Sequence, residues 1–360
     1  MSQSPELVER LRAWLERGQP QGPYSVHLSP TMACDLDCLF CRRQDGLNAF
    51  RKANTELSDE RWLQVAEEAL SMGARFVFIK GGGEPLLRRE LMQRLIPLVK
   101  AKGACGHVVT NGTHIDEGLA RLFAAARWDQ VTISLDGPDP ATHDFLRNKP
   151  GVFAEVMSGL ARLRSAKAAA GSALPRLAFH CVLTSRNFDR MAELIELARG
   201  QGVEHIELDS MSLRDESARP LLMSPEAEQR FQELLPDCLK RLERHGLSHN
   251  FALFSRSGYV RREAPAERCA AFCYYPWYQA SLTPGGSIVP CCYAEETHRS
   301  QDNLVSVAFR KAWEEGDCRQ YRAAMAEGRL LPFCKDCTAM YADNNAELRR
   351  ALGEADHARR

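Results

Sequence analysis

The segment that decides the fold is residues 24–41, which reads YSVHLSPTMACDLDCLFC. Its first five residues form a short run typical of a buried strand, and cysteines follow at positions 34, 38 and 41. Three thiols so close together lie on an expected strand-to-helix loop. A structural zinc site needs four ligands, whereas three thiolates on a four-iron cluster leave one iron open for another ligand. The spacing therefore favours an iron–sulfur site with an open position.

Outward from this segment, short apolar runs alternate with amphipathic stretches. The expected strands are 24–28, 75–79, 107–110, 131–135, 177–183 and 205–208. The expected helices are 58–72, 87–102, 116–126, 152–170 and 187–201, and one more that follows the cap residue Ser224. Largely apolar strands in this repeat imply a parallel α/β sheet, either doubly wound or closed toward a barrel. In both folds the functional groups lie at the C-terminal ends of the strands.

Changes in pattern divide the chain into four expected parts. Residues 1–23 predict a helix and a linker, because Gly18, Pro20, Gly22 and Pro23 end the helical periodicity. Residues 24–245 carry the strand–helix repeat. From about residue 246 short aromatic segments and cysteines replace that repeat, so 246–345 predicts a smaller α+β domain. Residues 346–360 read as a charged tail.

Composition narrows the function classes. The chain has 47 Lys and Arg against 47 Asp and Glu, so no positive excess favours binding to nucleic acid or to an anionic membrane. It has neither an apolar run of membrane-spanning length nor an apolar stretch near its N-terminus, which predicts a cytoplasmic protein. Thirteen cysteines in such a chain favour metal or redox chemistry over a disulfide framework.

The Cys-x3-Cys-x2-Cys loop, with Phe40 before its last cysteine, resembles the radical S-adenosylmethionine (SAM) superfamily. Over about residues 24–210 the resemblance implies a partial (β/α)6 TIM-like barrel. It also implies that Cys34, Cys38 and Cys41 hold a [4Fe-4S] cluster whose fourth iron binds the amine and carboxylate of SAM. One electron from the cluster would release methionine and a 5'-deoxyadenosyl radical, which removes a hydrogen atom from a substrate carbon.

Motifs after the later strands are similar to cofactor-binding residues of the same superfamily. The resemblance assigns Gly82, Gly83 and Glu84 to the SAM amino group, and Arg147 to the SAM carboxylate. It adds Asn111 and Ser134, at the ends of the third and fourth strands, to the cofactor site. The glycine that usually follows the arginine is Asn148 here. Without the resemblance, such residues are equally typical of turns and helix caps.

His180 and Cys181 lie within the fifth expected strand. Alternate positions of a buried strand face the packing helices, so we expect both residues to belong to the core rather than to bind a ligand.

A second cysteine group lies toward the C-terminus. Spacing alone does not choose between zinc and iron–sulfur for Cys273, Cys291, Cys334 and Cys337. Residues 265–340 resemble the SPASM or shorter twitch extension of radical SAM enzymes, which implies that these four thiols hold one auxiliary [4Fe-4S] cluster. Cys269 is the rival for the first ligand. No cysteine follows Cys337, so ligands for a second auxiliary cluster are missing.

The resemblance predicts a radical SAM oxidoreductase that dehydrogenates a small hydroxylated or amino metabolite, with the auxiliary cluster taking the second electron. The small-metabolite class is favoured because only about 25 residues precede the first strand, too few for a separate peptide-recognition domain. The alternative is a peptide-modifying maturase or an epimerase with a thiol hydrogen donor, for which Cys292 is the candidate beside Cys269 and Cys181. A flavodoxin or ferredoxin is the expected electron donor. A non-catalytic zinc-binding scaffold is the competing class.

Overall fold

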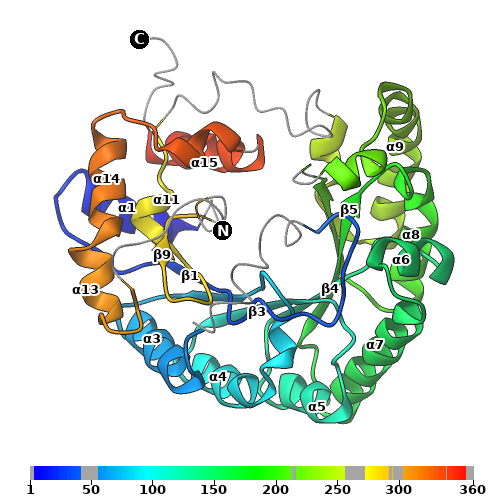
Figure 1. Cartoon of the computed structure of the whole chain (residues 1–360), viewed down its shortest axis with the longest axis horizontal. Helices are drawn as coiled ribbons and strands as arrows, with labels where there is room; N and C mark the ends of the chain where they lie inside the picture. The colour runs from blue at the N-terminus through cyan, green and yellow to red at the C-terminus, as the bar shows by residue number, and fades with distance from the viewer. Residues whose placement is uncertain are drawn as a thin grey trace.

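The computed structural model describes residues 4–41, 56–211, 213, 216–255, 272–291, 294, 303–337 and 339–353. A curved sheet runs through it, with helices along its convex side (Figure 1). The six expected strands are confirmed, each within two residues at either end: β1 (Ser25–Leu28), β2 (Phe76–Ile79), β3 (Cys105–Thr110), β4 (Gln130–Ser134), β5 (Arg176–Leu183) and β6 (His205–Ser210).

The expected helices are also present. They are α3 (Asp59–Ser71), α4 (Arg89–Ala101), α5 (Glu117–Ala125), α7 (Val152–Ala169), α8 (Met191–Gly200) and α9 (Pro225–His245). The helices α3 and α9 begin where a serine caps them, because Ser58 Oγ accepts from Arg61 N and Ser224 Oγ from Ala227 N, each at 3.2 Å. Short 3₁₀ turns, η2 (Pro85–Leu87) and η3 (Phe188–Arg190), precede α4 and α8. The helix α6 (Pro140–Arg147) was not among the expected elements.

Within the described residues the strand order is β7-β6-β5-β4-β3-β2-β1-β8-β9. The strands β1 to β6 are parallel and neighbours in chain order, which confirms the partial (β/α)6 barrel. At one end of the sheet β7 (Ser248–His249) pairs with β6. The 3₁₀ turn η5 (Phe251–Ser255) follows β7 in the chain. At the other end β8 (Gln279–Leu282) pairs in parallel with β1, and β9 (Ile288–Val289) pairs antiparallel with β8. The C-terminal region therefore extends the same sheet.

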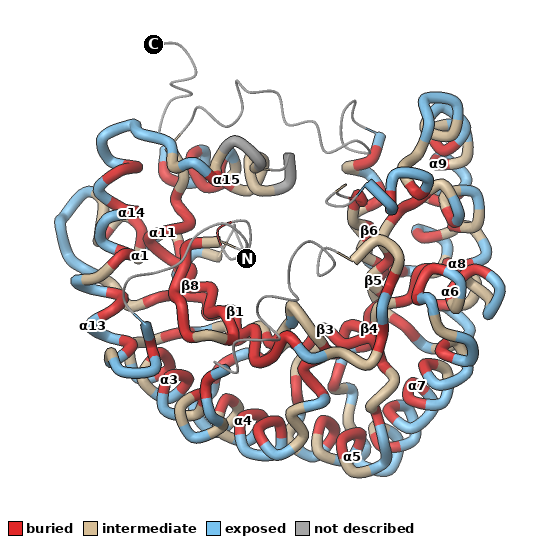
Figure 2. Tube along the Cα trace, viewed as in Figure 1, coloured by how far each residue is buried: buried red, intermediate tan, exposed pale blue. Residues whose placement is uncertain are grey.

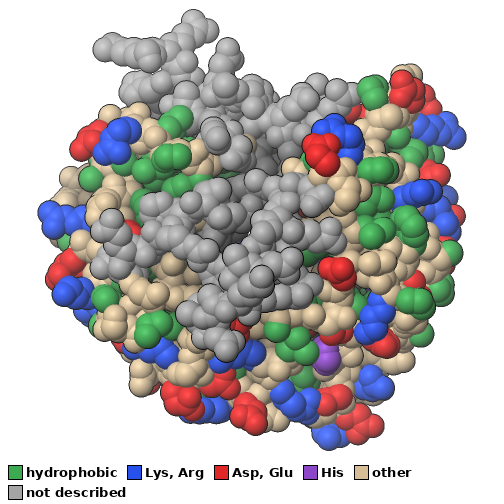
Figure 3. Space-filling model, in the orientation of Figure 1, with side chains coloured by type: hydrophobic (Ala, Val, Ile, Leu, Met, Phe, Trp, Pro, Cys, Tyr) green, Lys and Arg blue, Asp and Glu red, His purple; other side chains and the backbone are tan. Residues whose placement is uncertain are grey.

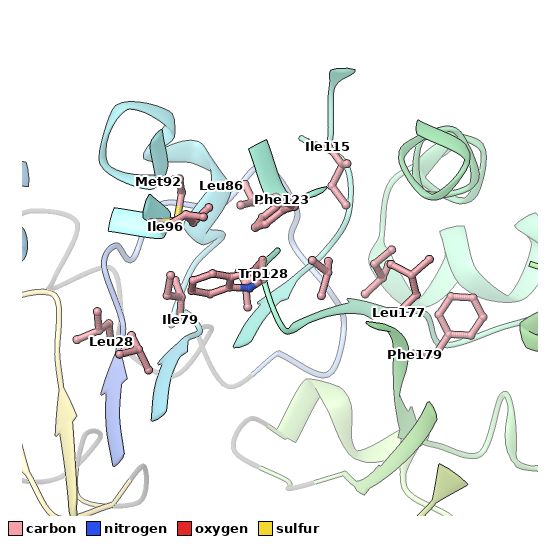
Figure 4. Close-up of a cluster of buried hydrophobic side chains, with 14 of the residues drawn as sticks. Leu28, Ile79, Leu86, Met92, Ile96, Ile115, Phe123, Trp128, Leu177 and Phe179 are labelled. Carbon is pink, nitrogen blue, oxygen red and sulfur yellow. The ribbon is translucent and has the colours of Figure 1, made fainter. Parts of the chain in front are cut away.

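The main core lies between the convex face of the sheet and its helices. Leu28, Ile79 and Phe179 come from strands, and Met92 and Ile96 from α4 (Figure 4). Each of these five side chains is fully buried. Figure 2 shows buried residues along the strands and exposed ones on the outer sides of the helices. The sheet thus has one face closed by helices and one concave face that opens toward the site.

A second core joins the two ends of the chain. Leu7 and Leu11 of α1 (Pro5–Leu15) pack with Trp277 of α11 (Tyr275–Tyr278) and with Leu348 of α15 (Ala339–Leu352). Three further elements precede α15: α13 (Phe309–Glu314), α14 (Asp317–Ala326) and η6 (Pro332–Asp336). Earlier in the chain, the 3₁₀ turn η4 (Glu216–Leu221) follows β6. The domain limits expected at residues 23, 245 and 345 stay predictions, and α15 continues across the last of them.

The visible surface carries both charge signs. Figure 3 shows Lys and Arg interspersed with Asp and Glu around the described rim, in keeping with the equal numbers of acidic and basic residues. Among the described helices, none combines the length and the apolar composition that crossing a membrane requires.

Candidate functional site

The three cysteines of the first motif follow β1 at the C-terminal ends of the strands. Cys38 is buried, with 7% of its surface exposed, and Cys34 and Cys41 are partly exposed. All three thiols are free of disulfides. Cys41 N donates to Cys38 O at 3.0 Å, which turns the backbone between the last two thiols. The loop therefore places three thiols at the edge of the sheet where parallel-strand proteins place their sites.

The glycine motif after β2 packs directly against this loop. Gly83 N donates to Thr31 O at 3.0 Å and Glu84 N to Ala33 O at 2.8 Å. A Cβ atom on Gly83 would lie 2.0 Å from the Ala33 carbonyl oxygen, and one on Gly82 would lie 2.4 Å from Met32 Sδ. At Gly83, where the neighbouring atom belongs to the backbone, only glycine permits so close an approach, whereas the Met32 side chain beside Gly82 could move. The glycines thus hold the segment that leads into Cys34, and their predicted contact with the SAM amino group stays a prediction.

Glu84 joins the ends of β2 and β3. Its Oε1 accepts from Leu86 N at 2.9 Å and from Thr110 Oγ1 at 2.7 Å, and its Oε2 accepts from Asn111 N at 2.7 Å. Burial raises the pKa of Glu84 to about 7, although these hydrogen bonds act in the opposite direction. Most of the acceptor capacity of this carboxylate is therefore used within the protein.

Asn111 connects the end of β3 to the cysteine loop. Its Nδ2 donates to Asp35 Oδ1 at 2.8 Å and lies 4.0 Å from Cys34 Sγ. Thr113 Oγ1 donates to the other oxygen of Asp35 at 2.8 Å. Burial would raise the pKa of Asp35, but the hydrogen bonds from Asn111 and Thr113 hold it below its usual value. Sequence reasoning missed Asp35, although its position between two cysteines was a usable signal.

Arg147 ends α6 and lies against the cysteine loop. Its Nη1 donates to Cys38 Sγ at 3.5 Å, and its Nη2 forms an ion pair with Asp136 Oδ2 at 2.6 Å. Burial raises the pKa of the Cys38 thiol, and Arg147 acts to lower it. Asp136, which sequence reasoning also missed as a site residue, has no exposed surface. The expected pairing of Arg147 with the SAM carboxylate stays a prediction.

Asn148, at the position where glycine is usual, has a backbone conformation that suits glycine. It caps α6 with φ 54° and ψ 36°, the left-handed conformation that glycine adopts readily and asparagine tolerates better than most residues. Asn148 N donates to Phe145 O at 3.1 Å, which closes the last turn of the helix. Arg147 therefore keeps a regular helical position.

Ser134, the last residue of β4, is partly exposed and lies opposite His180 of β5 in the sheet register. The core placement expected for His180 is wrong, since its side chain is 24% exposed and lies 3.9 Å from Asp209 of β6. Cys181 is fully buried in the main core, on the opposite face of β5. Alternation along the strand separates the two residues: one faces the concave side and the other the helices.

The four predicted auxiliary ligands come from three segments of the C-terminal region. Cys273 precedes α11, Cys291 follows β9, and Cys334 and Cys337 lie in and just after η6. Cys273 and Cys334 pack against one apolar cluster, and Cys291 and Cys334 pack against another. Cys334 therefore contacts both apolar clusters, one together with Cys273 and the other together with Cys291. Cys269 and Cys292 lie outside the described residues.

The donor chemistry of both groups fits iron–sulfur clusters. Thiolates are soft ligands that select iron–sulfur, zinc or copper(I). In the described part of the chain, no three His, Cys, Asp or Glu side chains converge closely enough to hold a single metal ion. In a four-iron cluster each thiolate binds a different iron, so the ligands need not converge on one point. Cys34, Cys38 and Cys41 would hold one cluster, and Cys273, Cys291, Cys334 and Cys337 a second.

Comparison with known proteins supports this assignment. A family model described as the radical SAM superfamily matches residues 28–198, and one described as an iron–sulfur cluster-binding SPASM domain matches residues 273–338. A PqqA peptide cyclase from Xanthomonas campestris pv. campestris (strain 8004) is 27% identical over 305 residues, covering 82% of this chain and 74% of the relative. Another PqqA peptide cyclase, from Rhizobium meliloti (strain 1021), is 25% identical over 329 residues, covering 89% and 81%.

Solved structures share the fold at lower sequence identity. SuiB from Streptococcus suis, bound to S-adenosylmethionine, has a TM-score of 0.64 and 15% identity, covering 92% of this chain and 76% of SuiB. The structure of anSMEcpe with bound AdoMet and a Cp18Cys peptide has a TM-score of 0.62 and 16% identity, covering 91% of this chain and 96% of anSMEcpe. The two family models assign this chain a SAM-binding [4Fe-4S] cluster and an auxiliary iron–sulfur domain. The chain belongs to the radical SAM superfamily and carries a C-terminal SPASM domain.

Proposed function

We propose that this protein is a peptide-modifying radical SAM enzyme, which removes a hydrogen atom from one residue of a genetically encoded peptide. One observation carries the proposal: relatives 25–27% identical over most of the chain are PqqA peptide cyclases. SuiB, which shares the fold, has also been crystallised with its precursor peptide SuiA bound. A peptide substrate thus has better support than the small metabolite that the short segment before the first strand favoured.

The residues divide the task between two sites. Cys34, Cys38 and Cys41 would hold the cluster that, with SAM bound, supplies the 5'-deoxyadenosyl radical. Gly82, Gly83, Glu84, Asn111, Ser134 and Arg147 would bind and orient SAM beside it. Four thiolates on the auxiliary cluster leave no open iron, which favours electron transfer over substrate binding.

The concave face of the sheet would receive the substrate residue. His180 and Glu207 are partners in the β5–β6 register and both are partly exposed. Burial raises the pKa of Glu207, with Asp209 adding to the effect and His180 opposing it. Groups of this kind can hold a polar side chain and accept a proton from it.

The fate of the substrate radical decides among three reactions: dehydrogenation, formation of a new bond, and epimerisation. Electron transfer to the auxiliary cluster would give net oxidation, either a dehydrogenation or a new bond, and we favour this outcome. Return of a hydrogen atom from a thiol would give epimerisation, for which Cys292 remains the candidate donor. A reduced flavodoxin or ferredoxin would supply the first electron.

The test uses the anaerobically reconstituted holoenzyme with SAM and dithionite. One panel contains short peptides translated from open reading frames beside the gene, and the other contains sugars and aminocyclitols. The measurements are 5'-deoxyadenosine formation and the mass of each candidate substrate. We expect a peptide to stimulate 5'-deoxyadenosine formation and to lose two hydrogen atoms.

Deuterium distinguishes the alternatives. With the peptide deuterated at each residue in turn, one position should transfer deuterium to 5'-deoxyadenosine. An unchanged peptide mass in ordinary water, together with uptake of deuterium when the reaction runs in heavy water, would indicate epimerisation instead. Turnover of a sugar or aminocyclitol, with every peptide inert, would refute the peptide proposal and restore the small-metabolite prediction.

A further inference from the structure

The most buried thiol of the first motif is contacted from outside its own loop. Arg147 Nη1 donates to Cys38 Sγ at 3.5 Å, from a residue only 7% exposed. The Arg147 guanidinium carbon also lies 5.6 Å from the centre of the Phe40 ring. Leu39 N donates to Leu146 O at 3.0 Å, so the backbone of the loop is tied to the last turn of α6. Cys38 and Phe40 thus both lie against Arg147, and Leu39 between them is hydrogen-bonded to Leu146, the residue that precedes Arg147.

Asp136 fixes the direction of that cation. Besides the ion pair with Arg147, its Oδ1 accepts from Val182 N at 2.8 Å, and its carbonyl oxygen accepts from Asn187 Nδ2 at 2.8 Å. Its backbone N donates to His143 Nδ1 at 3.1 Å. The carboxylate is therefore held by β5, and its backbone by α6 and the residue before η3. A side chain anchored in this way can orient a guanidinium, because a carboxylate matches the geometry of its N–H groups.

We propose that Arg147, oriented by Asp136, is a positioning residue for the radical SAM cluster: it donates an N–H···S hydrogen bond to Cys38 and keeps a positive charge beside that sulfur. Adding an electron makes the cluster more negative, so a nearby cation and an N–H···S bond both favour the reduced form. The inference goes beyond the proposed function, since it holds for any substrate.

This role differs from binding the SAM carboxylate. A bidentate carboxylate contact needs two free N–H groups on one edge of the guanidinium. In the structure Nη1 faces Cys38 and Nη2 faces Asp136, each of these nitrogens carries a second N–H, and Nε has no hydrogen-bond partner among the described residues, so the contact with Cys38 does not use the whole guanidinium. The two roles predict different measurements: the first changes the cluster itself, and the second changes SAM affinity.

The test removes the ion pair without changing net charge. In Asp136→Asn/Arg147→Met no buried charge is left unpaired, so a shift in potential reports the local contact with Cys38. The readout is an EPR-monitored redox titration of the reconstituted holoenzyme, in which the relevant signal is the one that SAM perturbs. We expect the ratio of reduced to oxidised cluster at fixed potential to fall at least tenfold, which is about 59 mV for one electron. Arg147→Lys keeps the charge, so its ratio of reduced to oxidised cluster should lie between those of the wild type and the double variant.

The matched control removes another ion pair, between Asp139 at the start of the same helix and Arg190 at the end of η3. Asp139 precedes the first turn of α6, and its Oδ2 lies 2.7 Å from Arg190 Nη2. Asp139→Asn/Arg190→Met should leave the potential unchanged, because this more exposed pair has no contact with a thiol among those the structure describes. A wild-type potential in Asp136→Asn/Arg147→Met, or an equal shift in the control, would overturn the proposal. A wild-type potential with weakened SAM binding would assign Arg147 to the SAM carboxylate instead.

A second measurement does not depend on the double variant folding. Wild-type protein labelled with guanidino-¹⁵N arginine should show ¹⁵N hyperfine coupling to the reduced cluster in pulsed EPR, and Arg147→Lys should lose it. Absence of this coupling in the wild type would also overturn the proposal. Neither readout needs a substrate, so failure here is distinguishable from failure of the peptide proposal.

Discussion

His180 of β5 and Glu207 of β6 are partners in the sheet register, and both lie on the concave face of the barrel. Their neighbours Phe179, Cys181, Ile206 and Leu208 are buried in the main core on the other face. Ser134 of β4 is the next partner along the same row. This row leads from a residue expected near SAM to a carboxyl group whose pKa burial raises. We therefore expect the row to contact the residue from which hydrogen is removed.

Glu207→Gln tests this expectation. Loss of a proton acceptor at the substrate typically lowers turnover about 100-fold. Iron content should stay at the wild-type level, because Glu207 lies outside the predicted cluster ligands. The measurement is peptide-dependent 5'-deoxyadenosine formation, followed together with product. Glu204→Gln is the control, since Glu204 forms partly exposed ion pairs with Lys167 and Arg176 before β6 begins. Equal activity in the two variants would place the substrate elsewhere.

The sequence predicted local features of the fold well. The strand–helix repeat and the serine caps of α3 and α9 depend on neighbours in the chain, so periodicity and residue type locate them. The parallel pairing of β8 with β1 joins segments some 250 residues apart in the sequence. No local pattern specifies such a contact, which is why the C-terminal region was not expected to extend the sheet.

The site was predicted where its residues form a motif. The two cysteine groups and the glycine loop have recognisable spacing. Asp136 acts through a contact with Arg147, and Asp35 through contacts with Asn111 and Thr113, which only the folded chain brings together. His180 was assigned to the core because a strand in a parallel sheet is usually covered on both faces. In a barrel one face lines the interior, and the sequence does not say which.

Gly83→Ala should disturb the first cluster without unfolding the protein. The added Cβ would lie 2.0 Å from the Ala33 carbonyl oxygen, so the backbone leading into Cys34 must move. Overpacking of this kind costs about 1–3 kcal/mol. We expect a lower melting temperature and fewer irons per chain after reconstitution. Gly200→Ala is the control, because a Cβ there meets nothing within 4 Å. Full iron content in Gly83→Ala would show that the loop tolerates the displacement.

Substitutions at Asn148 should separate backbone conformation from side-chain chemistry. Its φ of 54° is left-handed, which costs most residues about 1–2 kcal/mol. Asn148→Gly should leave the free energy of unfolding unchanged or slightly higher, whereas Asn148→Val should lower it by about that amount. Since Arg147 is the preceding residue, Asn148→Val should also weaken the retention of the first cluster. Denaturant unfolding and iron analysis measure the two effects, and equal stability of the two variants would contradict the explanation.

The pH dependence of stability should report Glu84. Burial raises its pKa from 4.5 to about 7, so the folded state holds a proton that the unfolded state releases in this range. The free energy of unfolding therefore falls as pH rises from about 5 to 7, by up to about 3 kcal/mol from this group. Glu84→Gln removes that slope, and it also places an amide N–H₂ group opposite the Asn111 N–H donor. Denaturant titrations at several pH values measure the difference, and parallel curves for the two proteins would show that the pKa of Glu84 is not raised.

Cysteine substitution should count the clusters and assign their ligands. If Cys34, Cys38 and Cys41 hold one [4Fe-4S] cluster and the C-terminal four hold another, the wild type contains about eight irons per chain. Replacing the first three by Ala should leave about four irons, no signal that SAM perturbs and no 5'-deoxyadenosine. Replacing Cys273, Cys291, Cys334 and Cys337 by Ala should also leave about four, but with the SAM-sensitive signal intact. Cys105→Ala is the control, since that exposed thiol lies at the start of β3, the end opposite the site. About twelve irons in the wild type would require a second auxiliary cluster, and about four irons with one zinc would make the C-terminal site structural.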